Sequence, residues 1–213
     1  MSRTRFTLAA PSLRRVVAAL GIASLALIAA PATAGAADEV ATINTYSVWN
    51  GVDFVFPFGH PNTTTYGQTI TVPAGLTKIQ RFSFYLAENS GGGTQILRGE
   101  VYAWDGDSAT GSAVWESAPR TITLDATYQK VGMRPRCAPV TPGGQYVLFL
   151  SVSKDYEETP PNTLSQWAAN YTDVYAGGNV VYLNDAGDES QWTAGTWSAI
   201  STFDFAMKAK LNP

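Results

Sequence analysis

The sequence predicts an all-β fold, a single antiparallel β-sandwich that is jelly-roll-like. Apolar and polar residues alternate with the period of half-buried strands, most clearly in residues 203–211 and 81–86. Short turns rich in glycine and proline separate these segments. After residue 37, no long stretch has the spacing of an amphipathic helix. Many short strands divided by turns are typical of a sandwich or a barrel.

The expected strands follow one another along the chain without a linker or an internal repeat. In order, they are residues 42–48, 54–58, 68–72, 82–86, 95–104, 112–117, 120–124, 146–152, 180–184, 197–200 and 203–211. Residues 146–152 are apolar at both parities, which predicts a central strand covered on both faces. Residues 164–171, which follow Pro160 and Pro161, are expected to hold one or two helical turns. We therefore expect one domain over residues 38–213.

The first 37 residues have the order of a secretory signal peptide. Arg3, Arg5, Arg14 and Arg15 precede an apolar run over residues 16–30, and small residues suited to cleavage follow. A membrane-spanning helix needs about 20 apolar residues, so this run is short for one. We expect an extracellular, bacterial domain with no integral membrane segment after cleavage. The Arg14–Arg15 pair leaves twin-arginine export open beside ordinary secretion.

The charge of the chain changes once this leader is set aside. The leader holds 4 of the 14 basic residues and none of the 17 acidic ones, so the remainder has 10 against 17, a net charge of −7. An acidic surface repels phosphate backbones, and nucleic acid is therefore not an expected partner. Cys137 is the single cysteine, which rules out an internal disulfide. We expect it to be a partly buried, inert thiol, with an intermolecular disulfide or a reactive thiol as the alternative.

Catalytic motifs are missing from the sequence. His60 is the single histidine, it lies in a polar loop, and no nucleophile elbow accompanies it, so we expect a surface residue. One histidine and one cysteine cannot complete a zinc site. Glu100 and Glu116 lie on the two arms of a predicted hairpin and form a candidate carboxylate pair. A glycosidase holds such a pair about 5 to 10 Å apart, whereas outward-facing charges are the simpler interpretation.

The hairpin over residues 100–117 also carries candidate binding residues. Asp105 and Asp107 at its turn supply hard oxygens for a calcium ion, although their spacing is not that of an EF-hand. The acidic loop at residues 184–189 is a second candidate of the same kind. Trp104, Trp115 and Trp192 lie near loops or strand ends, where aromatic rings can stack on sugars. Burial in the core is the competing interpretation for all three.

Five strings follow one another along the chain, at residues 58–73, 82–86, 101–117, 142–153 and 203–209. In this order they resemble a set of small secreted bacterial proteins of unknown function. Many members of that set end in a Pro-Glu-Pro type sorting tail. The resemblance implies an exported β-sandwich and no established activity, so no site residues are implied. This chain stops at residues 210–213 without such a motif, which favours release or non-covalent attachment.

Taken together, these features predict a secreted, non-catalytic module that binds polysaccharide or a cell-surface glycan. One alternative is a glycan-acting hydrolase or lyase that uses carboxylates. The other is a structural protein of the extracellular matrix whose hairpins pair with themselves. No cofactor is expected beyond the calcium ion considered at Asp105 and Asp107.

Overall fold

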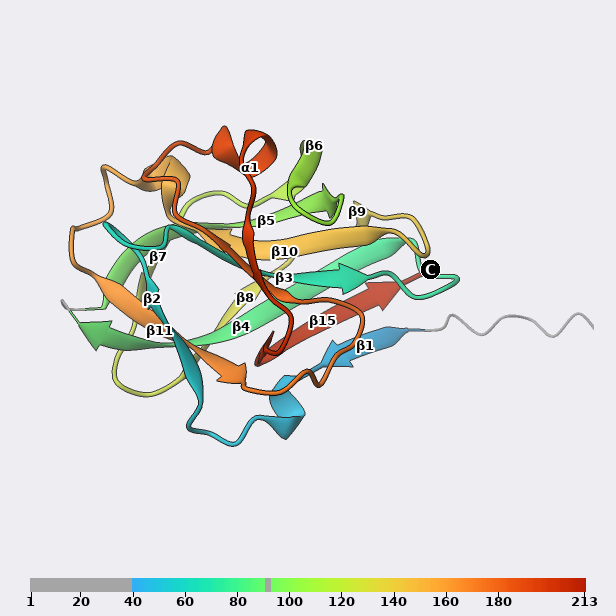
Figure 1. Cartoon of the computed structure of the whole chain (residues 1–213), viewed down its shortest axis with the longest axis horizontal. Helices are drawn as coiled ribbons and strands as arrows, with labels where there is room; N and C mark the ends of the chain where they lie inside the picture. Colours follow the sequence, from blue (N-terminus) through green and yellow to red (C-terminus); the bar gives the residue numbers. More distant parts are fainter. Residues whose placement is uncertain (1–39, 91–92) are drawn as a thin grey trace, which may run out of the picture. The chain divides into compact units, whose positions relative to one another are not determined.

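The computed structural model describes residues 40–90 and 93–213, which form two antiparallel β-sheets packed face to face (Figure 1). The expected signal peptide, residues 1–37, lies outside the described residues. No helix in the described part of the chain is both long and apolar enough to cross a membrane. The predicted all-β sandwich is confirmed.

The strands are mostly short and are interrupted by only a few helical turns. In chain order the elements are β1 (Ala41–Asn44), the 3-10 turn η1 (Tyr46–Val48), β2 (Phe54–Phe58), β3 (Thr65–Thr71), β4 (Lys78–Ser90), β5 (Thr94–Trp104), β6 (Ala109–Glu116), β7 (Arg120–Thr123), β8 (Gln129–Met133), β9 (Ala138–Pro139), β10 (Gln145–Ser151), the 3-10 turn η2 (Ser153–Asp155), β11 (Leu164–Asn170), β12 (Val180–Leu183), α1 (Gln191–Ala194), β13 (Ser198–Ile200), β14 (Asp204–Phe205) and β15 (Met207–Asn212).

The two sheets exchange strands along the chain as the jelly-roll expectation requires. Sheet A has the order β1-β15-β4-β11-β14, with β8 and β9 paired to β4 and β2 paired to β11. Sheet B has the order β13-β12-β3-β10-β5-β6, with β7 paired to β5. The chain passes from β3 in sheet B to β4 in sheet A and back to β5, and it repeats this crossing at β10, β11 and β12. Segments far apart in sequence thus become neighbours, as β1, β15 and β4 do in Figure 1.

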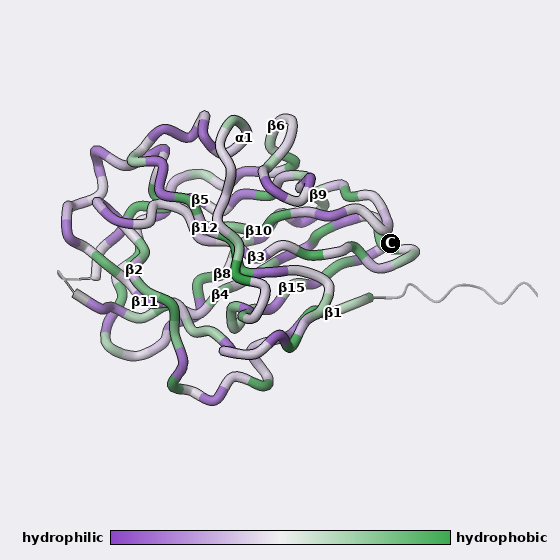
Figure 2. The backbone as a smooth tube through the Cα atoms, in the orientation of Figure 1, coloured by the Kyte–Doolittle hydropathy of each residue, from purple (hydrophilic) through white to green (hydrophobic). Residues whose placement is uncertain are grey.

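The core lies between the sheets and is built by the period-2 pattern. In β15, Met207, Ala209 and Leu211 are buried, while Lys208 and Lys210 lie on the outer face. Hydrophobic and hydrophilic segments accordingly alternate along the strands in Figure 2. The ring of Trp167 is fully buried, and its centroid lies 5.4 Å from that of Tyr66 in the opposite sheet. Aromatic packing across the sheets therefore fills much of the sandwich.

Two local predictions were wrong. Residues 164–171 were expected to be helical, but β11 occupies them, because Trp167 and Ala169 alternate inward and β4 and β2 pair on either side. Residues 42–48 were expected to be one strand, but β1 ends at Asn44. The side chain and carbonyl of Asn44 then accept hydrogen bonds from Ser47, which stabilises the 3-10 turn.

A second apolar cluster covers the outer face of sheet B. It comprises Tyr102, Ala109, Val147, Phe149, Val181, Trp192 and Trp197, with Trp104, Ala113 and Leu183 packed against it. The segment that contains α1 supplies its tryptophans and lies beside β6 (Figure 1). Sheet B is therefore covered on both faces, as predicted for residues 146–152.

Candidate functional site

Two of the three candidate tryptophans belong to the cluster on the outer face of sheet B. Trp192 is only 1% exposed, and its indole Nε1 donates a hydrogen bond of 2.8 Å to Oδ2 of Asp185. Trp104 is half-buried, and its ring meets that of Trp197 edge-on at 5.6 Å between centroids. Both rings are held by packing, and that of Trp192 is closed to a ligand from outside.

Trp115 lies on the opposite face of sheet B. It pairs in register with Val101 of the main core, and its ring stands perpendicular to that of Phe82 at 6.0 Å. The structure therefore brings Trp104 and Trp192 together and leaves Trp115 apart from them. A platform made by all three is not formed, and sugar contact by Trp104 or Trp115, the two half-buried rings, stays a prediction.

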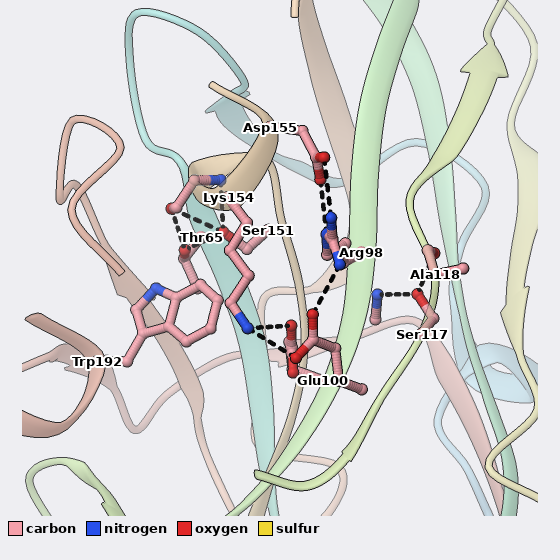
Figure 3. A network of polar contacts seen from close by, with 12 residues as sticks. Thr65, Arg98, Glu100, Ser117, Ala118, Ser151, Lys154, Asp155 and Trp192 are labelled. Atoms are coloured by element: carbon pink, nitrogen blue, oxygen red, sulfur yellow. Dashed lines mark hydrogen bonds and ion pairs between the residues drawn. The ribbon is translucent and has the colours of Figure 1, made fainter. Parts of the chain in front are cut away.

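Glu100 and Glu116 are directly opposite in the β5–β6 ladder, so they share the outer face of sheet B. Lys154 Nζ lies 2.7 Å from Oε2 of Glu116 and 3.7 Å from Oε1 of Glu100. Arg98 bridges Glu116 and Asp155, with both contacts at 2.8 Å. Figure 3 shows these ion pairs as a network, with the Trp192 ring beside Lys154.

The two glutamates have opposite pKa shifts. Burial raises the pKa of Glu100 to about 8, and the nearby Lys154 ammonium offsets this only in part. Burial also raises the pKa of Glu116, but hydrogen bonds from Lys154 and Arg98 outweigh it and leave the pKa below its ordinary value. In a catalytic carboxyl pair, the general acid needs a raised pKa and its partner needs a low one, so these two shifts have the directions that catalysis would require. Glu100 is, however, 0% exposed, so no substrate atom reaches its carboxyl group in this structure.

The carboxylate of Asp105 stabilises the β5–β6 turn itself. Oδ1 of Asp105 accepts hydrogen bonds from the backbone N–H of Asp107 at 2.9 Å and of Ser108 at 2.8 Å. In the second acidic loop, Asp185 accepts from Thr64, among other donors. Among the described residues, no three histidine, cysteine, aspartate or glutamate side chains gather as a metal site. The calcium site stays a prediction.

The single histidine, His60, and the single cysteine, Cys137, differ from expectation in their exposure to solvent. His60 is half-buried and not a free surface residue, because its ring packs against Tyr156 at 3.9 Å and its Nδ1 lies 3.1 Å from the carbonyl oxygen of Thr159. Cys137 is exposed and not partly buried, because it lies in a surface turn in which its N–H bonds to the carbonyl of Pro135.

A feature that the sequence did not reveal lies over sheet A. A hollow of about 730 Å³ is lined by Thr42, Arg81, Phe82, Ser83, Trp115, Ser117, Arg120, Lys130, Gly132, Met133, Arg134, Lys208, Ala209 and Lys210. We call it the sheet A hollow. A second hollow of about 450 Å³ adjoins it and is lined by Gln80, Arg81, Arg134, Arg136 and Lys210. No aspartate or glutamate of the described residues lines either one.

Strand pairing explains how the basic residues gather there. Lys210 of β15 lies opposite Arg81 of β4 and opposite Thr42 of β1, which places all three side chains in one row on the outer face. Lys208 and Ser83 form the next row, and Gly132 of β8 extends it. The alternation in residues 203–211 and 81–86 indicated a polar face for each strand. The sequence alone did not show that these faces are neighbours.

Comparisons with known proteins identify no relative in sequence. No family model matches the chain, and no curated protein matches it. Two solved structures resemble its fold. One contains the cysteine protease and lectin-like domains of Cwp84, a surface layer associated protein of Clostridium difficile, with a TM-score of 0.42 and 12% identity over 71% of this chain and 32% of that one.

The other is again the clostridial cysteine protease Cwp84, in a form obtained after propeptide cleavage, with a TM-score of 0.46 and 13% identity over 76% of this chain and 38% of that one. The chain thus spans about a third of the length of these structures. Neither likeness bears on what this chain binds. The resemblance to small secreted bacterial proteins likewise stays a prediction.

Proposed function

We propose that this protein is an exported, non-catalytic module that binds polysaccharide in the sheet A hollow. The observation that carries the proposal is the hollow itself, whose wall combines the half-buried ring of Trp115 with polar side chains from β1, β15, β4 and β8. An aromatic face stacks on the apolar face of a sugar ring, and neighbouring polar groups bond its hydroxyls. Export rests on the signal-peptide pattern of residues 1–37.

The extent of the site favours a chain of sugars over a single small molecule. The sheet A hollow and its neighbour share Arg81, Arg134 and Lys210, so the two adjoin and form one longer track. Strands of sheet A line the site together with Trp115, Ser117 and Arg120 from the β6–β7 region of sheet B, and polar groups from several strands suit a repeating ligand. A polymer can occupy both hollows at once.

The arrangement of carboxylates supports a binding role over a catalytic one. A glycosidase needs two carboxyl groups that flank the bond to be cleaved. No carboxyl group of the described residues lines the hollow. The pair formed by Glu100 and Glu116 lies instead on the outer face of the other sheet. Because Glu100 is shielded from solvent, that pair is better explained as a structural ion network.

Trp115→Phe tests the proposal by changing the ring on the wall of the hollow. The purified protein and this variant are incubated with a panel of insoluble and immobilised polysaccharides, neutral and charged, and the bound fraction is measured. We expect the variant to retain less than half of the binding of the parent, since the indole offers the larger stacking face. Trp104→Phe is the matched control, because that ring lies outside the hollow.

The outcomes separate the proposal from its alternatives. Equal losses from the two substitutions would place the ligand elsewhere, and no retention on any polysaccharide would overturn the proposal. Release of reducing ends from any member of the panel would show that the protein is an enzyme after all. Melting temperatures of both variants are measured in parallel so that a folding defect is recognised.

A further inference from the structure

We infer that the ligand of the sheet A hollow is a polyanionic glycan, a sugar polymer that carries carboxylate, sulfate or phosphate groups. The inference rests on the proposed function and adds the chemical class of the polysaccharide. The distribution of acidic and basic side chains supports this class of ligand. The chain beyond residue 37 is acidic by 17 residues to 10, yet no acidic side chain of the described residues lines either hollow.

The basic residues are concentrated at this one place. Of the ten that follow residue 37, seven line the two hollows: Arg81, Arg120, Lys130, Arg134, Arg136, Lys208 and Lys210. The other three are engaged elsewhere. Arg98 and Lys154 are held in ion pairs with carboxylates, and Lys78 Nζ donates a hydrogen bond of 2.8 Å to the carbonyl oxygen of Pro213.

Within the part of the chain that the structure describes, the cations of the hollow take part in no ion pair. Lys210 and Arg81 lie directly opposite one another in the ladder, an arrangement in which like charges repel. Lys208 Nζ has an aromatic neighbour instead of an anion, the ring of Tyr46 at 5.1 Å. A bound anion would relieve this repulsion, and a neutral sugar would not.

The geometry favours several anionic groups along a chain over one small ion. The seven side chains come from β4, β7, β8, β15 and the turn after β8, so their charges are spread along both hollows. Four of them are arginines, whose planar fork of donors matches carboxylate, sulfate and phosphate. Arg120 is already positioned, because its Nη1 donates a 2.6 Å hydrogen bond to the carbonyl oxygen of Gly132.

Glycan is favoured over nucleic acid by the small number of aromatic rings in the wall of the hollow. Proteins that bind single strands stack successive bases on several aromatic rings. In the described residues, Trp115 is the one half-buried aromatic in the wall, since Phe82 is 1% exposed.

The test measures affinity for four fluorescently labelled oligomers of equal length by anisotropy. They are an oligogalacturonate, a sulfated oligosaccharide, a phosphodiester-linked glycan and a neutral cello-oligosaccharide. We expect at least one anionic oligomer to bind about tenfold or more tightly than the neutral one, and its affinity to fall by a further tenfold or more between about 50 and 500 mM salt. The member that binds identifies which anionic group is recognised.

Two substitutions that each remove one positive charge test whether the anionic oligomer binds in the hollows. Lys210→Gln removes a cation of the hollows, and Lys78→Gln removes a cation outside them from the paired strand. We expect Lys210→Gln to weaken anionic binding about threefold to tenfold and to reduce the salt slope, and Lys78→Gln to leave both nearly unchanged. Equal effects of the two substitutions would mean that only overall charge matters and would overturn the inference.

The remaining outcomes distinguish this inference from the proposal on which it rests. Salt-independent binding of the neutral oligomer at equal affinity would overturn the inference and leave the proposed function standing. Failure of all four oligomers to bind would overturn both. Tighter binding of a single-stranded oligonucleotide with the same number of charges would overturn the choice of a glycan.

Discussion

Replacing Glu100 by glutamine changes the stability of the fold in a way that depends on pH. The carboxyl group is fully buried, and neither of its oxygens has a hydrogen-bond partner in the described residues. Burial raises its pKa from an ordinary 4.5 to about 8, so the folded state resists ionisation that the unfolded chain undergoes freely. For an acid with a raised pKa, stability is greatest below pH 4.5 and is lost as the pH rises toward 8.

The size of the effect follows from the two pKa values. A rise from 4.5 to about 8 corresponds to roughly 5 kcal/mol between the two ionisation states. At pH 5 the unfolded chain has begun to ionise and the cost is only about 1 kcal/mol, whereas at pH 7.5 it is about 4 kcal/mol. Glu100→Gln removes the ionisation, so the variant should gain about 3 kcal/mol relative to the parent between these two pH values.

Urea unfolding followed by tryptophan fluorescence, at pH 5 and at pH 7.5, measures this difference. Any constant offset between glutamine and a protonated glutamate cancels when the two pH values are compared. Glu116→Gln is the matched control, because its effect on the unfolding free energy should depend on pH in the opposite direction. Its pKa lies below the ordinary value, so its ionised form stabilises the fold at neutral pH, and the loss in the variant should shrink as the pH falls below 4.5. Parallel pH profiles for the parent and Glu100→Gln would refute the reasoning.

Three further outcomes are expected. Trp192→Phe should cost about 1–3 kcal/mol in unfolding free energy, because Oδ2 of buried Asp185 loses the indole donor; an unchanged urea midpoint would contradict this. Gly178→Ala should lower the melting temperature strongly, since a Cβ would overlap the carbonyl oxygen of Thr69, whereas Gly132→Ala meets only an ordinary contact with Ser83 at 3.9 Å and should be tolerated. Millimolar calcium should leave the melting temperature unchanged, because Oδ1 of Asp105 is already engaged by two backbone N–H groups of the β5–β6 turn; a rise would establish a site.

The sequence predicted the fold well because burial in a two-sheet protein has a period of two. Residues 203–211 show this pattern directly, and β14 and β15 occupy most of them. Residues 164–171 did not show it, because Ala168, on the face opposite Trp167, is also buried, in a cluster with Tyr85 and Ala206. The helical prediction was therefore wrong at a place where burial on both faces of the strand removed the alternation of apolar and polar residues.

The candidate site was harder to predict, since it depends on which strands are neighbours. The sequence put Glu100 and Glu116 on the two arms of one hairpin but left their register open, and the structure shows them directly opposite, beyond a register shift between Val101 and Ala103. Lys154, which joins them, comes from a distant loop that no local pattern connects to the hairpin. The same is true of Arg81 and Lys210, which are far apart in sequence and adjacent in the ladder.

Beyond residue 37 the chain has a net charge of −7, and this charge acts over a different distance from the cationic hollow, which shapes how affinity depends on salt. At about 0.01 M ionic strength the Debye length is about 30 Å, so an approaching polyanion experiences the whole acidic protein as well as the hollow. At about 0.15 M it is about 8 Å, and the basic side chains dominate. Counterion release alone predicts a straight line of log affinity against log salt. We therefore expect a flatter slope below about 0.1 M than above it for the anionic oligomer, measured by anisotropy. A constant slope over the whole range would show that the acidic remainder of the surface does not reach the ligand.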